Sequence, residues 1–283
     1  MRIAESELII NDDGSIYHLN LKPGDLSTCI ITVGDQNRVD KVASYFESIE
    51  LTIQKREFKT ITGLYKGKRL SVISTGIGTD NIDIVLNEID ALFNVDFDSR
   101  LIKSELIQLE FIRIGTSGVL RSEIPVDSLL ISNAAIGTEG LLNFYEFEES
   151  EELKQIDAST NNVYCYYAAA DPQLVGHFQD PGILNGITVT ANGFYGPQMR
   201  SVRLKPKSNH WLEKLQALDF APLQITNLEM ETAGIYAMAR LLGHRAVSIN
   251  ALLANRKEGV FSSQAEKTES KMIAWALEKV LAL

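Results

Sequence analysis

The stretch "NLEMETAGIYAMAR", residues 227–240, places two carboxylates directly before a run with helical spacing. Glu229 and Glu231 are two residues apart, and on a helix residues at that spacing point about 200° away from each other. In an extended or turning segment, by contrast, two such residues share one side of the chain. The stretch therefore predicts a strand-to-helix turn from which both carboxylates point together toward a polar partner.

Apolar segments with strand character alternate with helical patterns on both sides of this turn. The segment "GLYKGKRLSVISTG" (63–76), for example, predicts a hairpin with Gly67 in its turn, followed by a core strand. This alternation predicts an α/β fold with a largely parallel, buried sheet and helices on its faces. The other predicted strands are 28–34, 111–118, 128–137, 186–196 and 245–256, and the predicted helices are 37–49, 80–93, 209–217, 230–242 and 265–282.

The composition is that of an ordinary globular enzyme-sized domain. The chain has 283 residues, of which 45% are hydrophobic and 23% charged, so one large domain is expected. Its net charge of -10 would repel a phosphate backbone, so nucleic acid is not an expected partner. Cys29 and Cys165 are too few for a disulfide framework, and no apolar stretch approaches the ~20 residues of a membrane span. These features, with the lack of a signal sequence, predict a cytoplasmic protein that has no contact with membranes.

Two glycine-containing segments are candidates for an anion site. "TVGDQNR" (32–38) and "RIGTSG" (113–118) are predicted to be turns that follow strands, where glycine lets the backbone approach a ligand and an arginine lies nearby. Either segment alone could be ordinary turn geometry. Together they favour a phosphate group as the ligand.

Other chemistries find little support in the sequence. The four histidines and two cysteines lack metal-ligand spacing, so no metal site is predicted. "GTSGV" differs from the G-x-S-x-G elbow of serine hydrolases. His18, taken alone, has the character of a surface or interface histidine.

Six motifs, in order and with matching spacing, resemble those of the nucleoside phosphorylase family, most closely its uridine phosphorylase branch. The resemblance implies a single catalytic domain over 1–283, built around a distorted, partly closed mixed sheet. It also implies dimers that commonly form a hexamer, with active sites shared between subunits. The motifs are "GDQNRVDKVASYF" (34–46), "REF" (56–58), "STGIG" (74–78), "IRIGTSG" (112–118), "FYGPQMR" (194–200) and "EMETAGIYAMA" (229–239).

The resemblance also implies roles for individual residues around phosphate and ribose. Glu231 would accept hydrogen bonds from the 2′ and 3′ hydroxyls, Met230 would pack under the sugar, and Glu229 would lie beside it. Glu229 has a second interpretation, as a carboxylate that stabilises a helix N-terminus. The phosphate would bind Gly34, Arg38, Arg113 and Thr116, while the neighbouring subunit would contribute Arg56 to the phosphate and His18 to the ribose 5′ hydroxyl.

The implied base pocket indicates a pyrimidine. Gln198 and Arg200 would read the uracil carbonyls and N3, with Phe194 against the ring and Arg256 behind Arg200. Purine-cleaving relatives carry an aspartate near the end of a later strand, but here that stretch reads "LLANR" (252–256) and holds no acid.

The expected reaction is therefore phosphorolysis of uridine to uracil and ribose 1-phosphate, with inorganic phosphate as co-substrate and no cofactor. A purine nucleoside phosphorylase, a nucleosidase and a non-catalytic nucleoside-binding relative remain the alternatives. Some relatives hold a monovalent cation near the positions of 79–81, where this sequence differs, so no cation is assigned. Three further differences are Gln36 in place of the usual proline, an exchanged order of Gly196 and Pro197, and a segment at 93–105 that resembles an insertion.

Overall fold

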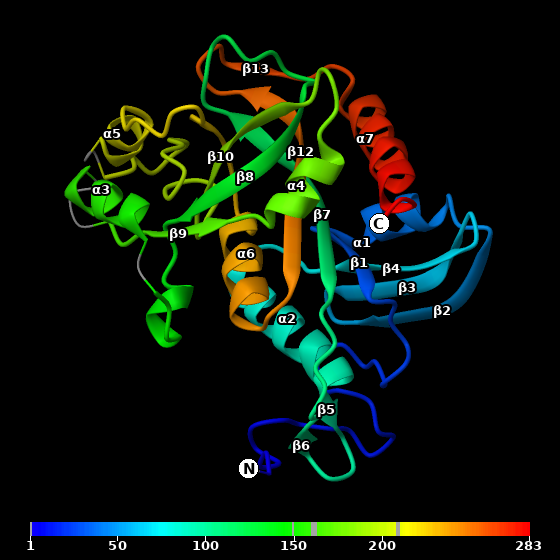
Figure 1. Ribbon diagram of the computed structural model, residues 1–283. Helices are drawn as coiled ribbons and strands as arrows, with labels where there is room; N and C mark the ends of the chain where they lie inside the picture. The colour runs from blue at the N-terminus through cyan, green and yellow to red at the C-terminus, as the bar shows by residue number, and fades with distance from the viewer. Residues whose placement is uncertain (1, 149, 160–162, 208–209) are drawn as a thin grey trace.

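The computed structural model describes residues 2–148, 150–159, 163–207 and 210–283, and shows helices packed on both faces of a sheet (Figure 1). The helices are α1 Gln36–Ala43, α2 Thr79–Asn94, α3 Glu151–Ser159, α4 Pro172–Phe178, α5 Trp211–Gln216, α6 Thr232–Leu241 and α7 Ala265–Val280, with a 3₁₀ helix η1 at Leu141–Phe144. The strands are β1 Cys29–Val33, β2 Ser48–Lys55, β3 Phe58–Tyr65, β4 Lys68–Ser74, β5 Val95–Asp96, β6 Leu101–Ile102, β7 Glu110–Val119, β8 Leu129–Gly137, β9 Tyr166–Ala169, β10 Leu184–Thr190, β11 Ile225–Glu229, β12 Arg245–Asn255 and β13 Val260–Phe261.

One mixed sheet organises the molecule. In the described residues its order is β13-β12-β8-β10-β11-β7-β1-β4-β3-β2, with β9 beside β8. Parallel pairings join β1 to β4 and β7, β7 to β12, and β10 to β8 and β11. Strand β12 also pairs with β8, and β7 also pairs with β11, both in the antiparallel sense. Strands β7, β12, β8, β10 and β11 therefore close on themselves, which confirms the distorted, partly closed mixed sheet.

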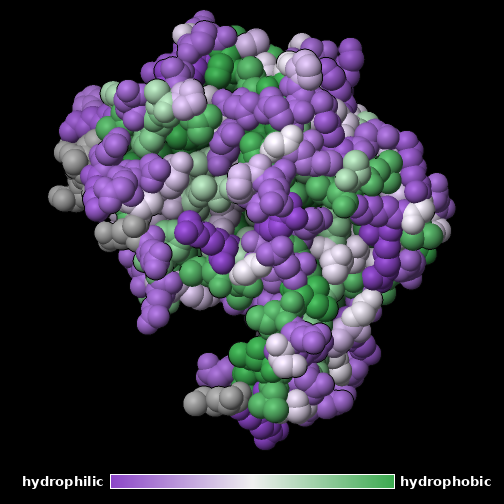
Figure 2. Space-filling model, viewed as in Figure 1, coloured by the Kyte–Doolittle hydropathy of each residue, from purple (hydrophilic) through white to green (hydrophobic). Residues whose placement is uncertain are grey.

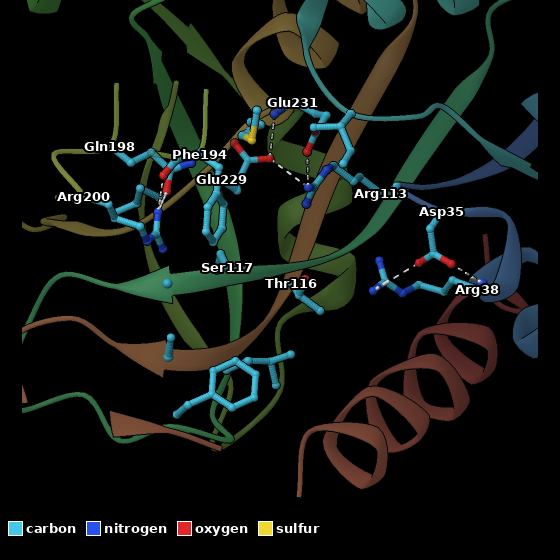
Figure 3. A pocket seen from close by; sticks show the side chains of 18 residues that line it. Asp35, Arg38, Arg113, Thr116, Ser117, Phe194, Gln198, Arg200, Glu229 and Glu231 are labelled. Carbon is cyan, nitrogen blue, oxygen red and sulfur yellow. Dashed lines mark hydrogen bonds and ion pairs between the residues drawn. The ribbon is translucent and has the colours of Figure 1, made fainter. Parts of the chain in front are cut away.

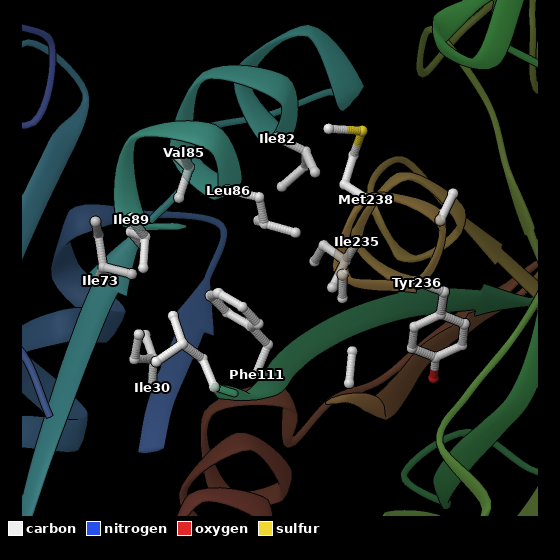
Figure 4. Packing of buried hydrophobic residues seen from close by; sticks show 14 of the residues in the cluster. Ile30, Ile73, Ile82, Val85, Leu86, Ile89, Phe111, Ile235, Tyr236 and Met238 are labelled. Atoms are coloured by element: carbon white, nitrogen blue, oxygen red, sulfur yellow. The ribbon is translucent and has the colours of Figure 1, made fainter. Parts of the chain in front are cut away.

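The sheet is buried on both faces because alternate residues of its central strands enter different cores. Ile30 of β1 and Phe111 of β7 pack with α2 and α6, as Figure 4 shows. Their neighbours Ile31 and Ile112 point to the opposite face and pack with α1, α4 and α7. Burial on both faces explains why these strands appear in the sequence as continuous apolar runs.

Most predicted elements are present. The predicted strands at 28–34, 128–137 and 245–256 correspond to β1, β8 and β12, and the hairpin at 63–76 has Gly67 in its turn with a φ of +80°. The predicted helices at 80–93, 209–217, 230–242 and 265–282 correspond to α2, α5, α6 and α7.

The predicted helix at 37–49 is wrong in its second half. Helix α1 ends at Ala43, and the chain turns into β2 at Ser48. The apolar residues that extended the helical pattern, Tyr45 and Ile49, are exposed. Antiparallel pairing of β2 with β3 decides this segment, so tertiary contacts override the local periodicity.

The predicted strand at 111–118 is confirmed as β7, which pairs with β12 along its whole length and continues to Val119, so "RIGTSG" lies in this strand and the turn predicted for it is wrong. One other boundary differs from the prediction. The strand predicted over 186–196 ends at Thr190, and the following residues form bends and turns that carry the base-site motif. Strand β11 is the strand of the predicted strand-to-helix turn at Glu229. The strands β2, β5, β6, β9 and β13 and the helices α3 and α4 were not predicted.

The segment at 93–105 forms the end of α2 and the small hairpin β5–β6, which lies with the N-terminal residues in a projecting lobe (Figure 1). The lobe carries apolar side chains, visible in green at the bottom of Figure 2, and its exposed members include Ile9, Leu101, Ile102 and Leu106. Among the described residues, no helix has the length and apolar character needed to cross a membrane.

A buried tyrosine joins helix α6 to the β8–β12 closure, where Ser132 and Ser248 are paired. The Tyr236 hydroxyl donates to the Ser132 carbonyl at 2.6 Å and accepts from the Ser248 N–H at 2.8 Å. Tyr236→Phe leaves this N–H without its partner, so we expect the free energy of unfolding in a denaturant titration to fall by about 1–3 kcal/mol. The exposed Tyr195→Phe is the control, with a change below about 0.5 kcal/mol. An equal change in the free energy of unfolding in the two variants would contradict a role for the Tyr236 hydroxyl in closing the sheet.

Candidate active site

A cavity of about 540 Å³ opens beside the ends of β1, β7, β11 and β12. Figure 3 shows three groups of polar side chains along it: Gln198 and Arg200 at one end, Glu229, Glu231 and Arg113 in the middle, and Asp35 and Arg38 at the other end. Ten of the residues expected at the site line this cavity: Gly34, Arg38, Arg113, Thr116, Phe194, Gln198, Arg200, Glu229, Met230 and Glu231.

The polar partner of the two carboxylates is Arg113. Glu229 is the last residue of β11, and Glu231 is the N-cap of α6. Their Oε2 atoms lie 2.9 Å and 2.8 Å from Arg113 Nη2, respectively. The strand-to-helix turn therefore directs both side chains to one side, as the sequence predicted.

Glu229 and Glu231 differ in their other contacts. Glu229 accepts hydrogen bonds from the backbone N–H groups of Glu231 at 2.9 Å and Thr232 at 3.0 Å, and from the Thr190 hydroxyl at 2.6 Å. It thus stabilises the N-terminus of α6, the second interpretation given above. Glu231 accepts from the Gly78 N–H at 2.8 Å and lines the cavity beside Met230.

Arg113 is held from several directions. Its guanidinium folds back over Gly115, where even a Cβ atom would lie 1.8 Å from Nη1. The same nitrogen donates to Asn250 Oδ1 of β12 at 3.2 Å. Gly115 therefore serves the close approach of a side chain, not a turn. This explains the glycine in a segment that forms a regular strand.

Burial and charge act in opposite directions on this cluster. Burial alone would lower the pKa of Arg113, but the charges of Glu229 and Glu231 outweigh it and raise the pKa. Burial raises the pKa of Glu231, Arg113 lowers it and Glu229 raises it, with a net upward shift. A cation shared by two buried carboxylates leaves Glu231 easier to protonate than an exposed glutamate.

The end of the cavity where phosphate is expected is formed by the turn after β1. Gly34 and Asp35 precede α1, and the Asp35 side chain caps this helix by accepting from the Arg38 N–H at 3.1 Å. The Arg38 guanidinium donates through Nε to Glu269 of α7, whose other oxygen accepts from Lys41 at 2.6 Å. Burial raises the pKa of Glu269, but the hydrogen bond from Lys41 and the charge of Arg38 lower it overall.

The end of the cavity where the base is expected is a loop whose central residue, Met199, has a left-handed backbone conformation. Gln198, 2% exposed, accepts through Oε1 from Arg200 Nη1, and the Arg200 guanidinium stacks 3.8 Å from the centroid of Phe194. The two polar side chains meet because Met199 between them has a φ of +59°, not because the segment is extended. Arg256 lies behind this loop and donates to the Gln198 carbonyl. Burial, and next the charge of Arg256, lower the pKa of Arg200.

Three expected residues, His18, Arg56 and Arg256, are absent from the lining of this cavity. Arg256 lies behind Gln198, as described above, whereas His18 and Arg56 both lie near Tyr17: the His18 ring is 4.7 Å from the Tyr17 ring, and the Arg56 guanidinium is 5.8 Å from it. His18 also forms an ion pair with Glu88 of α2, with Nδ1 2.6 Å from Oε1.

The motifs did not identify several lining residues. Ile77 and Phe261 are apolar, yet 66% and 69% of their surfaces are exposed at the cavity. Ile77 lies within the motif "STGIG" (74–78), which was given no residue role, and Phe261 follows the predicted strand at 245–256. The remaining ones are Asp35, Ser117, Gly118, Leu228, Leu253 and Ala254. In the described part of the chain, no group of His, Cys, Asp and Glu side chains could hold a metal ion.

A family model described as the Phosphorylase superfamily matches residues 28–282. The chain belongs to this superfamily. A uridine phosphorylase of Thermococcus kodakarensis is 30% identical over 274 residues, which cover 96% of this chain and 88% of that protein. A solved structure, a Trypanosoma brucei nucleoside phosphorylase described as showing uridine phosphorylase activity, has a TM-score of 0.87 and 29% identity, covering 98% of this chain and 100% of its own.

The superfamily also includes relatives with purine substrates in their names. A purine nucleoside phosphorylase of the DeoD type from Listeria monocytogenes is 28% identical over 273 residues, covering 93% of this chain and 98% of that protein. The resemblance drawn from the motifs and the fold class are therefore confirmed. The choice of base rests on the residues of the site, because both kinds of relative share the fold.

The raised pKa of Glu231 predicts a stability change that depends on pH. Protonated Glu231 favours the folded state at low pH, and this contribution is lost as the pH rises through the folded-state pKa. Glu231→Gln should therefore raise the free energy of unfolding at pH 8 by about 0.5–2 kcal/mol, because it removes a buried negative charge beside Glu229. The gain should shrink as the pH falls through the raised folded-state pKa of Glu231, and it should vanish below pH 4.5, the ordinary value of a glutamate.

Denaturant titrations at pH 8 and pH 4 measure this difference. Glu278→Gln is the control on α7, because its carboxylate accepts from Tyr65 and Lys66 and its pKa is lowered by those contacts. That variant should gain no stability at pH 8. A Glu231→Gln variant that gains more at pH 4 than at pH 8 would contradict the charge assignment.

Proposed function

We propose that this protein is a pentosyltransferase that cleaves uridine with inorganic phosphate, giving uracil and ribose 1-phosphate. The observation that supports this best is the order of groups along one cavity: a Gln–Arg pair on an aromatic ring, then buried carboxylates beside Met230, then Gly34 and Arg38. This order corresponds to base, ribose and phosphate. The reaction needs phosphate as co-substrate, and we propose no cofactor; a monovalent cation is not assigned.

The base end supplies the donors that uracil requires. The Gln198 oxygen already accepts from Arg200, so the amide NH₂ and the remaining guanidinium N–H groups can donate to the two uracil carbonyls. Cytosine presents an amino group in place of one carbonyl, and a guanidinium cannot accept from it. Phe194 offers its ring to the base.

The middle and the phosphate end supply the charges of the transition state. Breaking the N-glycosidic bond leaves positive charge on the ribose ring and sends the bonding electrons to uracil N1. Glu231 binds the ribose hydroxyls near this positive charge, and Arg38 and Arg113 orient the phosphate that bonds to C1′. Arg200 and Gln198 stabilise the uracil anion, which finally takes the proton that the phosphate loses.

The alternatives are less well supported by the same residues. As far as the structure describes the chain, no carboxylate lines the cavity beside Gln198 and Arg200, where a purine would need an acid. A nucleosidase has no use for a second arginine, Arg38, at the far end of the cavity beyond Arg113. A binding protein would not need Arg113 held over the backbone by a specific glycine.

We further propose that residues 1–283 act as one catalytic domain in a homodimer or hexamer, in the cytoplasm, with sites shared between subunits. The charge balance of the site supports the sharing of sites between subunits. At the ribose and phosphate end the described residues include the cations Arg38, Lys41 and Arg113 and the carboxylates Asp35, Glu229, Glu231 and Glu269, a sum of -1 when all are ionised. A phosphate dianion needs further positive charge, which Arg56 of a neighbouring subunit would supply. His18 beside it would reach the ribose.

The first test of this function is a substrate panel. Cleavage of uridine should require inorganic phosphate and yield ribose 1-phosphate, and kcat/KM should exceed that for cytidine and inosine by about 1,000-fold, because unmatched groups would remain buried at the base end. Uridine, cytidine and inosine are compared in phosphate buffer and in phosphate-free buffer. Free ribose at an undiminished rate without phosphate would indicate a nucleosidase, and inosine equal to uridine would indicate a purine enzyme.

The second test concerns the shared site. Arg56→Ala and Glu231→Gln should each lower kcat/KM by about 100-fold, since each removes a contact made in the transition state. Mixing the two inactive proteins should restore part of the activity, because some mixed dimers contain one site with Arg56 and Glu231 intact. Glu231→Gln mixed with itself is the control. If exchange of subunits is demonstrated and no activity returns, Arg56 does not act in a neighbour's site.

A further inference from the structure

The turn between β2 and β3 places Arg56 in an unfavourable backbone conformation. Lys55 and Phe58 are paired in the hairpin, so Arg56 and Glu57 form its two-residue turn. Arg56 has a φ of +57°, in the left-handed region that glycine or asparagine usually fills. A non-glycine residue stays in this region only where its surroundings hold it there, and such positions are frequent at functional sites.

Gln36 holds this turn from outside. Its side-chain N–H donates to the Arg56 carbonyl at 2.8 Å, and its side-chain oxygen accepts from Gln54 Nε2 of β2 at 2.9 Å. A primary amide can donate and accept at once, which a proline or an aliphatic side chain cannot do. The Gln36 side chain therefore has a structural role, because it links the start of α1 to the β2–β3 hairpin through two hydrogen bonds.

The start of α1 also belongs to the protein's own cavity. Gln36 is the first residue of α1 and follows Gly34 and Asp35, which line the phosphate end. The hairpin turn, in contrast, directs the Arg56 guanidinium toward Tyr17 and away from this cavity. Lys55 of the same hairpin donates to the Tyr17 carbonyl at 2.6 Å, which ties the turn to the segment that carries His18.

We propose that Gln36 is a positioning residue that fixes Arg56 for the phosphate site of a neighbouring subunit. In this proposal the segment 34–38 serves two active sites. Gly34 and Arg38 bind the phosphate in the site of their own chain, and Gln36 positions Arg56 for the site of the neighbouring subunit. This proposal rests on the proposed shared site. It does not require Gln36 to touch a substrate.

The test is a double-mutant cycle with Gln36→Met and Arg56→Ala, measuring KM for phosphate and for uridine separately. Methionine keeps the length of the side chain and removes both hydrogen bonds. Gln36→Met alone should raise KM for phosphate about tenfold, the size of one or two net hydrogen bonds, and change KM for uridine less than about twofold. In the Arg56→Ala background, Gln36→Met should have less than about a twofold effect, because the arginine it positions is gone.

Gln36→Ala is measured in parallel in case methionine packs badly, and the neighbouring exposed Asn37→Ala is the control that should leave both KM values unchanged. Equal effects of Gln36→Met with and without Arg56 would overturn the proposal, as would an unchanged KM for phosphate in Gln36→Met and Gln36→Ala. If Arg56→Ala leaves KM for phosphate unchanged, the proposal fails while phosphate-dependent cleavage by the wild type stands. If the wild type cleaves without phosphate, the proposed function fails as well.

Discussion

The buried ion pairs of Arg113 with Glu229 and Glu231 are the constraint on which the rest of the site depends. Arg113 is on β7, which pairs with β1, β12 and β11, and the carboxylates belong to the junction of β11 and α6. Removing charges from water costs several kcal/mol per ion, so these groups need each other and the surrounding donors. One charge cluster therefore fixes the centre of the sheet, the start of a helix and the middle of the cavity.

The same cluster explains the electrostatic character of the cavity. Arg113 and Arg38, the cations expected to bind phosphate, are each already paired with carboxylates from their own chain. This pairing keeps the arginines ordered before the anion arrives, which lowers the entropy lost on binding. It also leaves little net positive charge for a dianion, and a fourth cation from a neighbouring subunit resolves this imbalance in the proposed assembly.

Two left-handed residues and one close approach of a side chain to the backbone occur at positions that the proposed chemistry uses. Met199 and Arg56 have left-handed backbone conformations, and Gly115 leaves space for a guanidinium that a Cβ would exclude. Hydrogen bonds from neighbouring side chains stabilise both left-handed turns. Arg200 and Arg256 donate to carbonyls of the turn around Met199, and Gln36 donates to the Arg56 carbonyl. Rigid placement of polar groups is what stabilisation of a charged transition state requires.

The sequence by itself determined the α/β class, most of the central strands and helices, and the pairing of Glu229 with Glu231 on one side of a turn, because these follow from local periodicity and chain geometry. Most of the motif residues do line one cavity, so the candidate site was largely visible in the sequence too. Only the tertiary structure decided that the glycines of "RIGTSG" form no turn, that the helix after β1 ends at Ala43, and that Arg56 and His18 both lie near Tyr17. These outcomes depend on strand pairing and on contacts between segments far apart in the chain, for which a local pattern carries no information.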